Sequence, residues 1–370
     1  MNILVAIALW LLIIVVATAW HELGHYWAAR AQGVAVKSFS VGMGPIIYRK
    51  MIRGTEWRVS ALPIGGYVEI DGMAPDADRD GKLRAPTRGF AKLGALGKIV
   101  ILLMGPIFNL LLALPLLAGY YTTQGVTTPL TDRASIGSVT PNSLAQRVGV
   151  EAGDVIVAID GRDIPDFYIV DGKRREGYRQ VQDALALPGR KSFSLERDGR
   201  TRDVTFDWNP KDDKGERRRF GISYGPAILT RQVAFLPALG EAVKTMVTGV
   251  PLVLQAFGNL VGNLVTLNTN PSADSGVSGP VRTVETVGQA AQLGAWSVLG
   301  IAALINLSLA LFNLIPIPGL DGGRILLVLV QSVLRRPLSF EQENFINFLG
   351  FAFVLVLMVF VVFSDVARFF

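Results

Sequence analysis

The 370-residue sequence has no cysteine and only two histidines. Without cysteine there are no disulfide bonds and no thiolate metal ligands, and the redox compartment cannot be inferred. Charged residues make up only 18% of the chain, whereas hydrophobic residues make up 50%. This balance is typical of membrane proteins rather than of purely soluble chains.

Four segments are long and apolar enough to cross a bilayer, which takes about 20 residues. They are Ile3–Trp20 (continuing into the histidines), Ile99–Tyr120, Ala295–Ile315 and Phe345–Phe363. The stretch between the second and third segments is polar enough for one soluble domain. We therefore predict a polytopic α-helical membrane protein with four transmembrane helices.

The net charge of +6 has a topological explanation. Residues 26–98 carry twelve Lys and Arg side chains, and none precedes the first span. The positive-inside bias therefore predicts that this loop is cytoplasmic and that the N-terminus lies outside. Because the membrane accounts for the basic residues, we expect no nucleic-acid partner.

Both histidines lie in one pentapeptide, His21-Glu22-Leu23-Gly24-His25. Residues four apart stack on one helix face, so both imidazoles can bind one zinc ion, with Glu22 beside them as a general base. Ionisable groups at membrane depth cost roughly 2.5–3.5 kcal/mol each on insertion scales, so they are usually functional. Since the motif ends an apolar run, we predict a metal site in the membrane rather than two partnered core histidines.

The third ligand must be a carboxylate, because catalytic zinc normally takes three protein ligands and no other His or Cys exists. Asp321 is the best-placed acid, in Asn313-Leu314-Ile315-Pro316-Ile317-Pro318-Gly319-Leu320-Asp321-Gly322-Gly323. The two prolines stop a helix, and unwound backbone at this depth is tolerated only in protein or beside a watery cavity. The alternative is a loop in which Asp321 merely caps a helix over 322–333.

The region from 135 to 207 has short strands and two short helices. The predicted strands are Ser135–Val139, Asp154–Ile159, Ser192–Arg197 and Thr201–Asp207, and the helices are Ser143–Arg147 and Tyr178–Leu187. Asp198-Gly199 predicts a hairpin turn. The run from Asn142 to Gly161 resembles the core of a PDZ domain, a module that commonly takes an extended peptide as an added strand. A β-rich domain with only a steric role is the alternative.

Three further segments have ambiguous or weaker patterns. Val36–Tyr48 and Glu56–Ile70 have strand character, interrupted by glycine and proline. Val243–Leu267 is apolar enough for a fifth span, but a lysine, two asparagines, three glycines and a proline dilute it. A fifth crossing would separate Asp321 from the histidines, so we expect a surface or re-entrant amphipathic element here.

Together, the two motifs resemble a known family. His-Glu-x-x-His at the first span, with Asn-x-x-Pro-x-Pro-x-x-Asp-Gly at a later one, is similar to the site-2 protease family of intramembrane zinc metalloproteases. The PDZ-like insert resembles the bacterial branch that cleaves anti-sigma factors and so regulates sigma-factor signalling. Gly105-Pro106-Ile107-Phe108-Asn109 also resembles that family. The chain departs from the best-known enterobacterial members in having room for one PDZ domain instead of two.

The resemblance implies a role for each site residue. His21, His25 and Asp321 would hold Zn²⁺, and Glu22 would act as general base and then as the acid for the departing amine. Asn313 would steady the peptide or its developing oxyanion, unless it simply bonds a neighbouring helix. The Glu56–Ile70 segment would match the family's membrane-associated β-hairpin, which is thought to take the substrate as an added strand.

The resemblance also implies an organisation and a location. Residues 1–121 would form two spans with the cytoplasmic hairpin loop, 122–210 the PDZ-like domain, 211–293 a linker with amphipathic membrane-surface helices, and 294–370 the last two spans with the third ligand. We expect a multi-pass protein of the bacterial inner membrane, with its active site towards the cytoplasm and its PDZ domain outside. The expected partners are the lipid bilayer and single-span substrates such as anti-sigma factors or remnant signal peptides.

Single features of the sequence also fit two other functions. A catalytically silent scaffold could bind partners through the PDZ domain, but it has no reason to keep Glu22 between two ligands. A zinc transporter or sensor would be expected to have several intramembrane acids and histidine-rich loops, and the sequence has neither.

Overall fold

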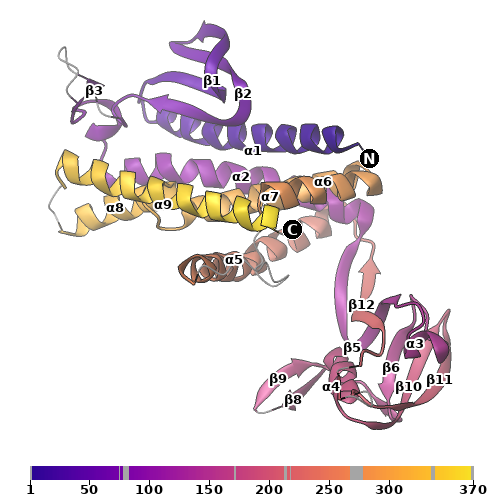
Figure 1. Ribbon diagram of the computed structural model, residues 1–370. Coiled ribbons are helices and arrows are strands. Elements are labelled where there is room, and N and C mark those ends of the chain that lie inside the picture. Colours follow the sequence, from indigo (N-terminus) through magenta and orange to yellow (C-terminus); the bar gives the residue numbers. More distant parts are fainter. Residues whose placement is uncertain are drawn as a thin grey trace. The chain divides into compact units, whose positions relative to one another are not determined.

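The computed structural model describes residues 2–74, 76–77, 83–170, 172–211, 215–216, 218–266, 278–334 and 338–367. It forms two compact units, residues 1–124 with 233–370 and residues 125–232 (Figure 1). We call the first the helical unit and the second the inserted unit. Each has its own buried core, so each is described by itself.

The helical unit contains seven α-helices in its described part. They are α1 (Ile3–Ala31), α2 (Ala95–Gln124), α5 (Phe235–Val265), α6 (Pro280–Leu293), α7 (Ala295–Leu314), α8 (Asp321–Leu334) and α9 (Phe340–Ala367). Among the described residues, five helices are long and apolar enough to cross a membrane: α1, α2, α5, α7 and most of α9. The four predicted spans lie in four of them. Helix α5 makes a fifth candidate, so the predicted count of four is not confirmed.

The directions of α1, α2 and α7 follow from their contacts. His25 of α1 reaches Ile101 of α2, whereas Trp20, five residues earlier, reaches Phe108, so the two helices are antiparallel. Helix α7 begins beside the end of α2. A Cβ atom placed on Gly119 of α2 would lie 3.2 Å from the ring of Trp296 in α7. It therefore runs parallel to α1 and ends at the histidines.

The sheet beside α1 consists of β1 (Val36–Ile52) and β2 (Thr55–Ile70), which are antiparallel (Figure 1). Residues 38–41 of β1 lie between two segments of β2. They pair with residues 66–69 on one side and with residues 56–59 on the other. The predicted interruptions at 42–45 appear as register shifts within a continuous strand. Ala28 and Ala29 of α1, Val36 of β1, Ile70 of β2 and Ile101 of α2 are buried together. This cluster packs the sheet against α1 and α2.

Short elements connect this sheet to α2. They are β3 (Asp76–Ala77), β4 (Leu83–Arg84) and the 3₁₀ turn η1 (Gly89–Lys92).

The inserted unit is built on a sheet with the strand order β11-β10-β6-β5-β12, to which β7 adds beside β6. Its elements are β5 (Val126–Val139), α3 (Leu144–Arg147), β6 (Val155–Ile159), β7 (Arg162–Asp163), β8 (Phe167–Val170), β9 (Lys173–Glu176), η2 (Gly177–Arg179), α4 (Gln180–Ala186), β10 (Gly189–Arg197), β11 (Arg200–Trp208) and β12 (Ile222–Arg231). The four predicted strands and the two predicted helices are all present. Asp198 and Gly199 both have positive φ, as the predicted tight hairpin turn requires.

The predicted end of the soluble domain, at residue 210, is wrong. Strand β12 pairs antiparallel with β5 from Ile222 to Arg231, so the inserted unit extends from residue 125 to 232. The sequence does not predict this strand because Gly221 precedes it and Gly225 and Pro226 lie within it. Glycine and proline usually indicate turns. The predicted linker over 211–293 is therefore partly strand, although its helical parts are present as α5 and α6.

One buried carboxylate ties β6 to β10 in this unit. Asp154 is fully buried and accepts hydrogen bonds from Nε and Nη2 of Arg197, at 2.5 and 2.9 Å, and from the backbone N–H of Glu151 at 2.9 Å. Burial raises the pKa of this carboxyl, but the bonds from Arg197 and Glu151 outweigh it and hold the pKa below its ordinary value. The ionised form of Asp154 therefore stabilises the fold.

We expect Asp154→Asn to lower the free energy of unfolding of residues 125–232 by about 2–3 kcal/mol, because it leaves Arg197 without its buried partner. Asp154 has a lower pKa folded than unfolded, so its contribution is present above about pH 4 and disappears as the pH falls through the folded pKa. Urea unfolding between pH 3 and 7 measures this. The exposed Asp163→Asn is the control, and an equal effect from it would contradict the account.

Candidate metal centre

Helix α1 continues through both histidines and places them on one face. Both side chains are buried, at 8% exposure for His21 and 6% for His25. Their rings meet edge to face, with the two Nε2 atoms 3.1 Å apart. The helical spacing of four residues therefore brings two imidazole nitrogens to one point.

The loop between α7 and α8 supplies the carboxylate. Helix α7 ends at Leu314, and the chain unwinds through Pro316 and Pro318 before α8 begins at Asp321, as predicted. A Cβ at Gly322 would overlap the carbonyl oxygen of Leu314, so only glycine lets α8 start this close to the loop. Oδ2 of Asp321 lies 3.1 Å from Nε2 of His21 and 3.3 Å from Nε2 of His25.

These separations fit a zinc ion. Tetrahedral ligands with bonds of about 2.0–2.1 Å stand roughly 3.3 Å from one another. The nitrogens of His21 and His25 and the carboxylate oxygen of Asp321 have separations of 3.1–3.3 Å. Two imidazoles and one carboxylate are also a ligand set used by catalytic zinc. The structure thus brings together all three predicted ligands.

The surroundings of the histidines fit the same ion. A metal-binding imidazole usually donates its other ring N–H to a nearby acceptor. Nδ1 of His25 lies 2.8 Å from the carbonyl oxygen of Ile101, which accepts this proton. Nδ1 of His21 faces the amide of Asn109 at 3.4 Å, and the Oδ1 atom of Asn109 is buried without a hydrogen-bond partner among the described residues. Rotating the side-chain amide of Asn109 by about 180° places its Oδ1 against Nδ1 of His21. The N–H of His21 then has an acceptor, and Oδ1 of Asn109 has a donor.

Gly105 of α2 keeps the space beside the ligands open. A Cβ built there would overlap Nε2 of both His21 and His25. Gly24 of α1 likewise allows the backbone of Met104 to approach, since a Cβ there would overlap its carbonyl oxygen. Small residues of this kind let membrane helices pack closely. The sequence-derived motif at 105–109 therefore has a packing role at Gly105 and a polar role at Asn109.

Glu22 lies between the ligands and the edge of the sheet. The backbone of Val68 in β2 lies next to its carboxylate. Both residues line a cavity of about 300 Å³ together with all three ligands. The carboxylate predicted to act as general base therefore lies beside the three ligands, next to a strand that lines the same cavity.

Asn313 also lines this cavity, but its amide is partly used within its own helix. Its Nδ2 donates to the carbonyl oxygen of Leu309 at 3.0 Å. The predicted role of Asn313 towards a peptide stays a prediction. The sequence places Asn109 in a family-like motif but does not relate it to His21, and it gives Val68 no individual role. The positions of both depend on how α2 and β2 pack against α1, which the local sequence does not indicate.

The comparisons with known proteins agree with this geometry. The family model for peptidase family M50 matches residues 6–357. A protein of Rhizobium meliloti is 33% identical over 375 residues, which cover 94% of this chain and 92% of that protein. A protein of Clostridium perfringens is 31% identical over 346 residues, covering 94% of each. Both relatives are named as inferred zinc metalloproteases.

We expect Asn109→Leu to weaken zinc binding by about 10–100-fold, because Nδ1–H of His21 would lose its acceptor. The measurement is competition with a chromophoric chelator on the purified chain. Asn306→Leu is the matched control. Asn306 is also a buried asparagine whose Oδ1 has no partner in the described part of the chain, but it lies in α7, outside the metal cavity. Equal zinc affinity in wild type and Asn109→Leu would contradict this role.

Proposed function

Because the chain belongs to peptidase family M50, the site-2 protease family, and is a zinc metalloprotease of the membrane, we propose that it cuts single-span membrane proteins within or near the bilayer. One observation carries the proposal. The ligands His21, His25 and Asp321 converge beside Glu22 among helices that are long and apolar enough to cross a membrane. A soluble peptidase would have no need to hold its ligands on such helices.

The chemistry follows from the positions of these side chains. Zinc, when bound, supplies a Lewis acid that polarises the peptide carbonyl and makes water more acidic. Glu22 accepts the proton of the attacking water and then passes it to the nitrogen of the departing amine. The backbone of Val68 lies next to the Glu22 carboxylate, where it limits the orientations that the carboxylate adopts. A scaffold without activity would not require such an arrangement.

The substrate must be unwound, because a peptide bond inside a helix is sterically closed to attack. Residues 66–70 of β2 pair with β1 along one edge and have no second strand partner in the described part of the chain. Tyr67, Val68 and Ile70 line the metal cavity. These contacts support addition of the substrate as a strand on this edge, where main-chain hydrogen bonds hold it extended.

The directions of α2 and α7 support a four-span topology. Helix α7 begins where α2 ends, so the chain between them must leave and return on one side of the membrane. Helix α5 lies along α2 and α7, with Tyr121 bonded to Thr245 and Phe257 against Phe312. A single crossing by α5 would require a second crossing before α7, and the 14 residues of α6 are too few for one. We therefore propose that α5 is re-entrant.

We propose that the inserted unit is a PDZ domain outside the cytoplasm. Strand β12 is at the edge of its sheet, and a cavity of about 1310 Å³ is lined by both β12 and α4. An edge strand beside a helix suits an extended peptide. This arrangement supports a role in selecting substrates such as anti-sigma factors or remnant signal peptides, in the inner membrane of a bacterium.

We expect Glu22→Gln to retain one zinc per chain but to cleave a single-span substrate about 10²–10⁴-fold more slowly, because only the base is removed. His21→Ala, His25→Ala and Asp321→Asn should lose zinc as well as activity. Metal analysis and cleavage assays in proteoliposomes measure both quantities, with the exposed Glu341→Gln as control. Full activity in Glu22→Gln would contradict the proposed protease mechanism.

The topology is testable because the chain has no cysteine. Single cysteines at Thr205 and Ser278 should both react with an impermeant reagent added outside, whereas one at Leu334 should react only after permeabilisation. These positions report the inserted unit, the start of α6 and the end of α8. Opposite sidedness of Thr205 and Ser278 would show that α5 crosses the membrane.

A further inference from the structure

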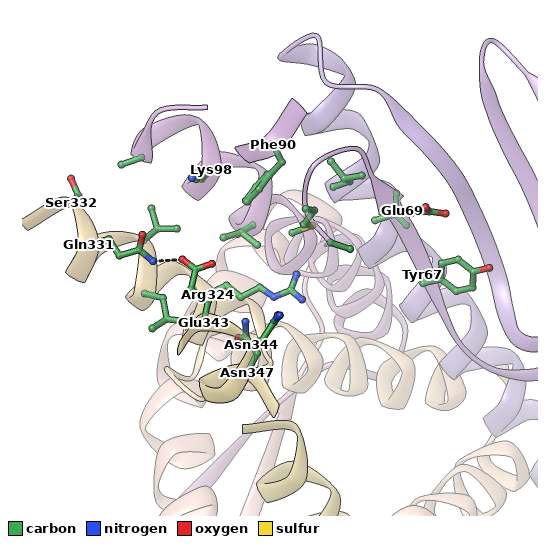
Figure 2. A pocket seen from close by; sticks show the side chains of 18 residues that line it. Tyr67, Glu69, Phe90, Lys98, Arg324, Gln331, Ser332, Glu343, Asn344 and Asn347 are labelled. Atoms are coloured by element: carbon green, nitrogen blue, oxygen red, sulfur yellow. Dashed lines mark hydrogen bonds between the residues drawn. The ribbon is translucent and has the colours of Figure 1, made fainter. Parts of the chain in front are cut away.

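A second and larger cavity adjoins the metal site (Figure 2). It has a volume of about 760 Å³ and is lined by residues of β2, α2, α8 and α9. Five of its lining residues also line the metal cavity: Tyr67, Val68, Ile70, Met73 and Arg324. A peptide lying on the edge of β2 at the metal would therefore continue directly into this larger space.

Arg324 stands on the wall shared by the two cavities. It follows the ligand Asp321 by three residues on α8, so the two side chains emerge on the same helix face. Its guanidinium points into the larger cavity and is half-buried (Figure 2). Among the described residues it has no hydrogen-bond or ion-pair partner. A half-buried guanidinium without a partner is a ready site for a carboxylate.

The other polar groups of this cavity do not neutralise Arg324. Glu69 is engaged by Ser38 and Lys37, and Glu343 accepts a hydrogen bond from Gln331 (Figure 2). The second cation, Lys98, lies over the ring of Phe90 at 5.8 Å. No anionic partner for Lys98 occurs in the part of the chain that the structure describes. The cavity thus offers two cations, Arg324 and Lys98, that no carboxylate among its described lining residues contacts directly, and either can receive an acidic ligand.

The lining favours a peptide over a lipid as the ligand. The edge of β2 offers main-chain groups to an extended chain, and Arg324 offers a charge to a carboxylate on that chain. A phospholipid phosphate offers the negative charge, but it has no reason to lie along a strand edge that leads to the metal.

We propose that this cavity holds the substrate segment next to the scissile bond, and that Arg324 binds an Asp or Glu side chain in it. The inference rests on the proposed function and adds a preference for substrates with an acidic residue near the cut. An extended substrate chain advances about 3.3 Å per residue. Because Arg324 lies about one helical turn from the ligand Asp321, we expect its side chain to reach a substrate residue about three positions from the cut. Arg324 is then a specificity-determining residue.

The test uses the full chain in proteoliposomes of neutral or anionic lipid and a set of single-span substrates. Each substrate carries Asp, Asn or Lys at one of four positions on either side of the cut, and kcat/KM is compared among the three at each position. At one position the wild type should prefer Asp by about 10-fold or more, as expected for a charge-assisted bond. Arg324→Gln should bring this ratio close to one, and Arg324→Glu should prefer Lys at the same position, with one zinc per chain in both variants.

Exposed Lys92→Gln is the matched control and should keep the preference for Asp. Three results would overturn the inference: no preference at any position, a preference that Arg324→Gln leaves unchanged, or a response of Arg324 to anionic lipid in place of substrate charge. These results are distinct from failure of the proposed function. If zinc-loaded wild type cleaves no substrate at all, the protease proposal falls, and this inference falls with it.

Discussion

Ionisable side chains among membrane-spanning helices are stable only when they partner one another, and this requirement organises the helical unit. His21 and His25 can share a metal because they are one helical turn apart, but the carboxylate that completes the set comes from 300 residues further along the chain. To deliver it, α7 must run parallel to α1, and the chain must unwind at the two prolines before Asp321. The re-entrant path proposed for α5 follows from the same requirement, since a further crossing would carry Asp321 to the opposite side.

Close approach of backbones makes this meeting possible. Gly24 and Gly105 bring α1 and α2 together at the ligands, and Gly322 brings the start of α8 onto the preceding loop. The close contact also lets backbone and amide groups serve the site, with the carbonyl of Ile101 bound to His25 and the amide of Asn109 facing His21. The packing and the chemistry of the site therefore depend on the same few positions.

Much of the site could be predicted from the sequence because its signals are local. The spacing of the histidines follows the helical period, and the prolines before Asp321 mark an unwound segment wherever they are placed. Strand β12 could not be predicted, because its pairing with β5 joins residues about 90 positions apart and its own pattern is broken by glycine and proline. The contact of Asn109 with His21 depends on the register of two packed helices, which no short motif specifies.

The central claim is that one zinc ion is held by two imidazoles and a carboxylate within the membrane. X-ray absorption at the zinc edge, on the full chain purified in detergent, tests it most directly. The account predicts one zinc per chain, with nitrogen and oxygen ligands at about 2.0–2.1 Å and the multiple-scattering pattern of two imidazoles. Zinc well below one per chain after loading, or a ligand shell without imidazole, would contradict it.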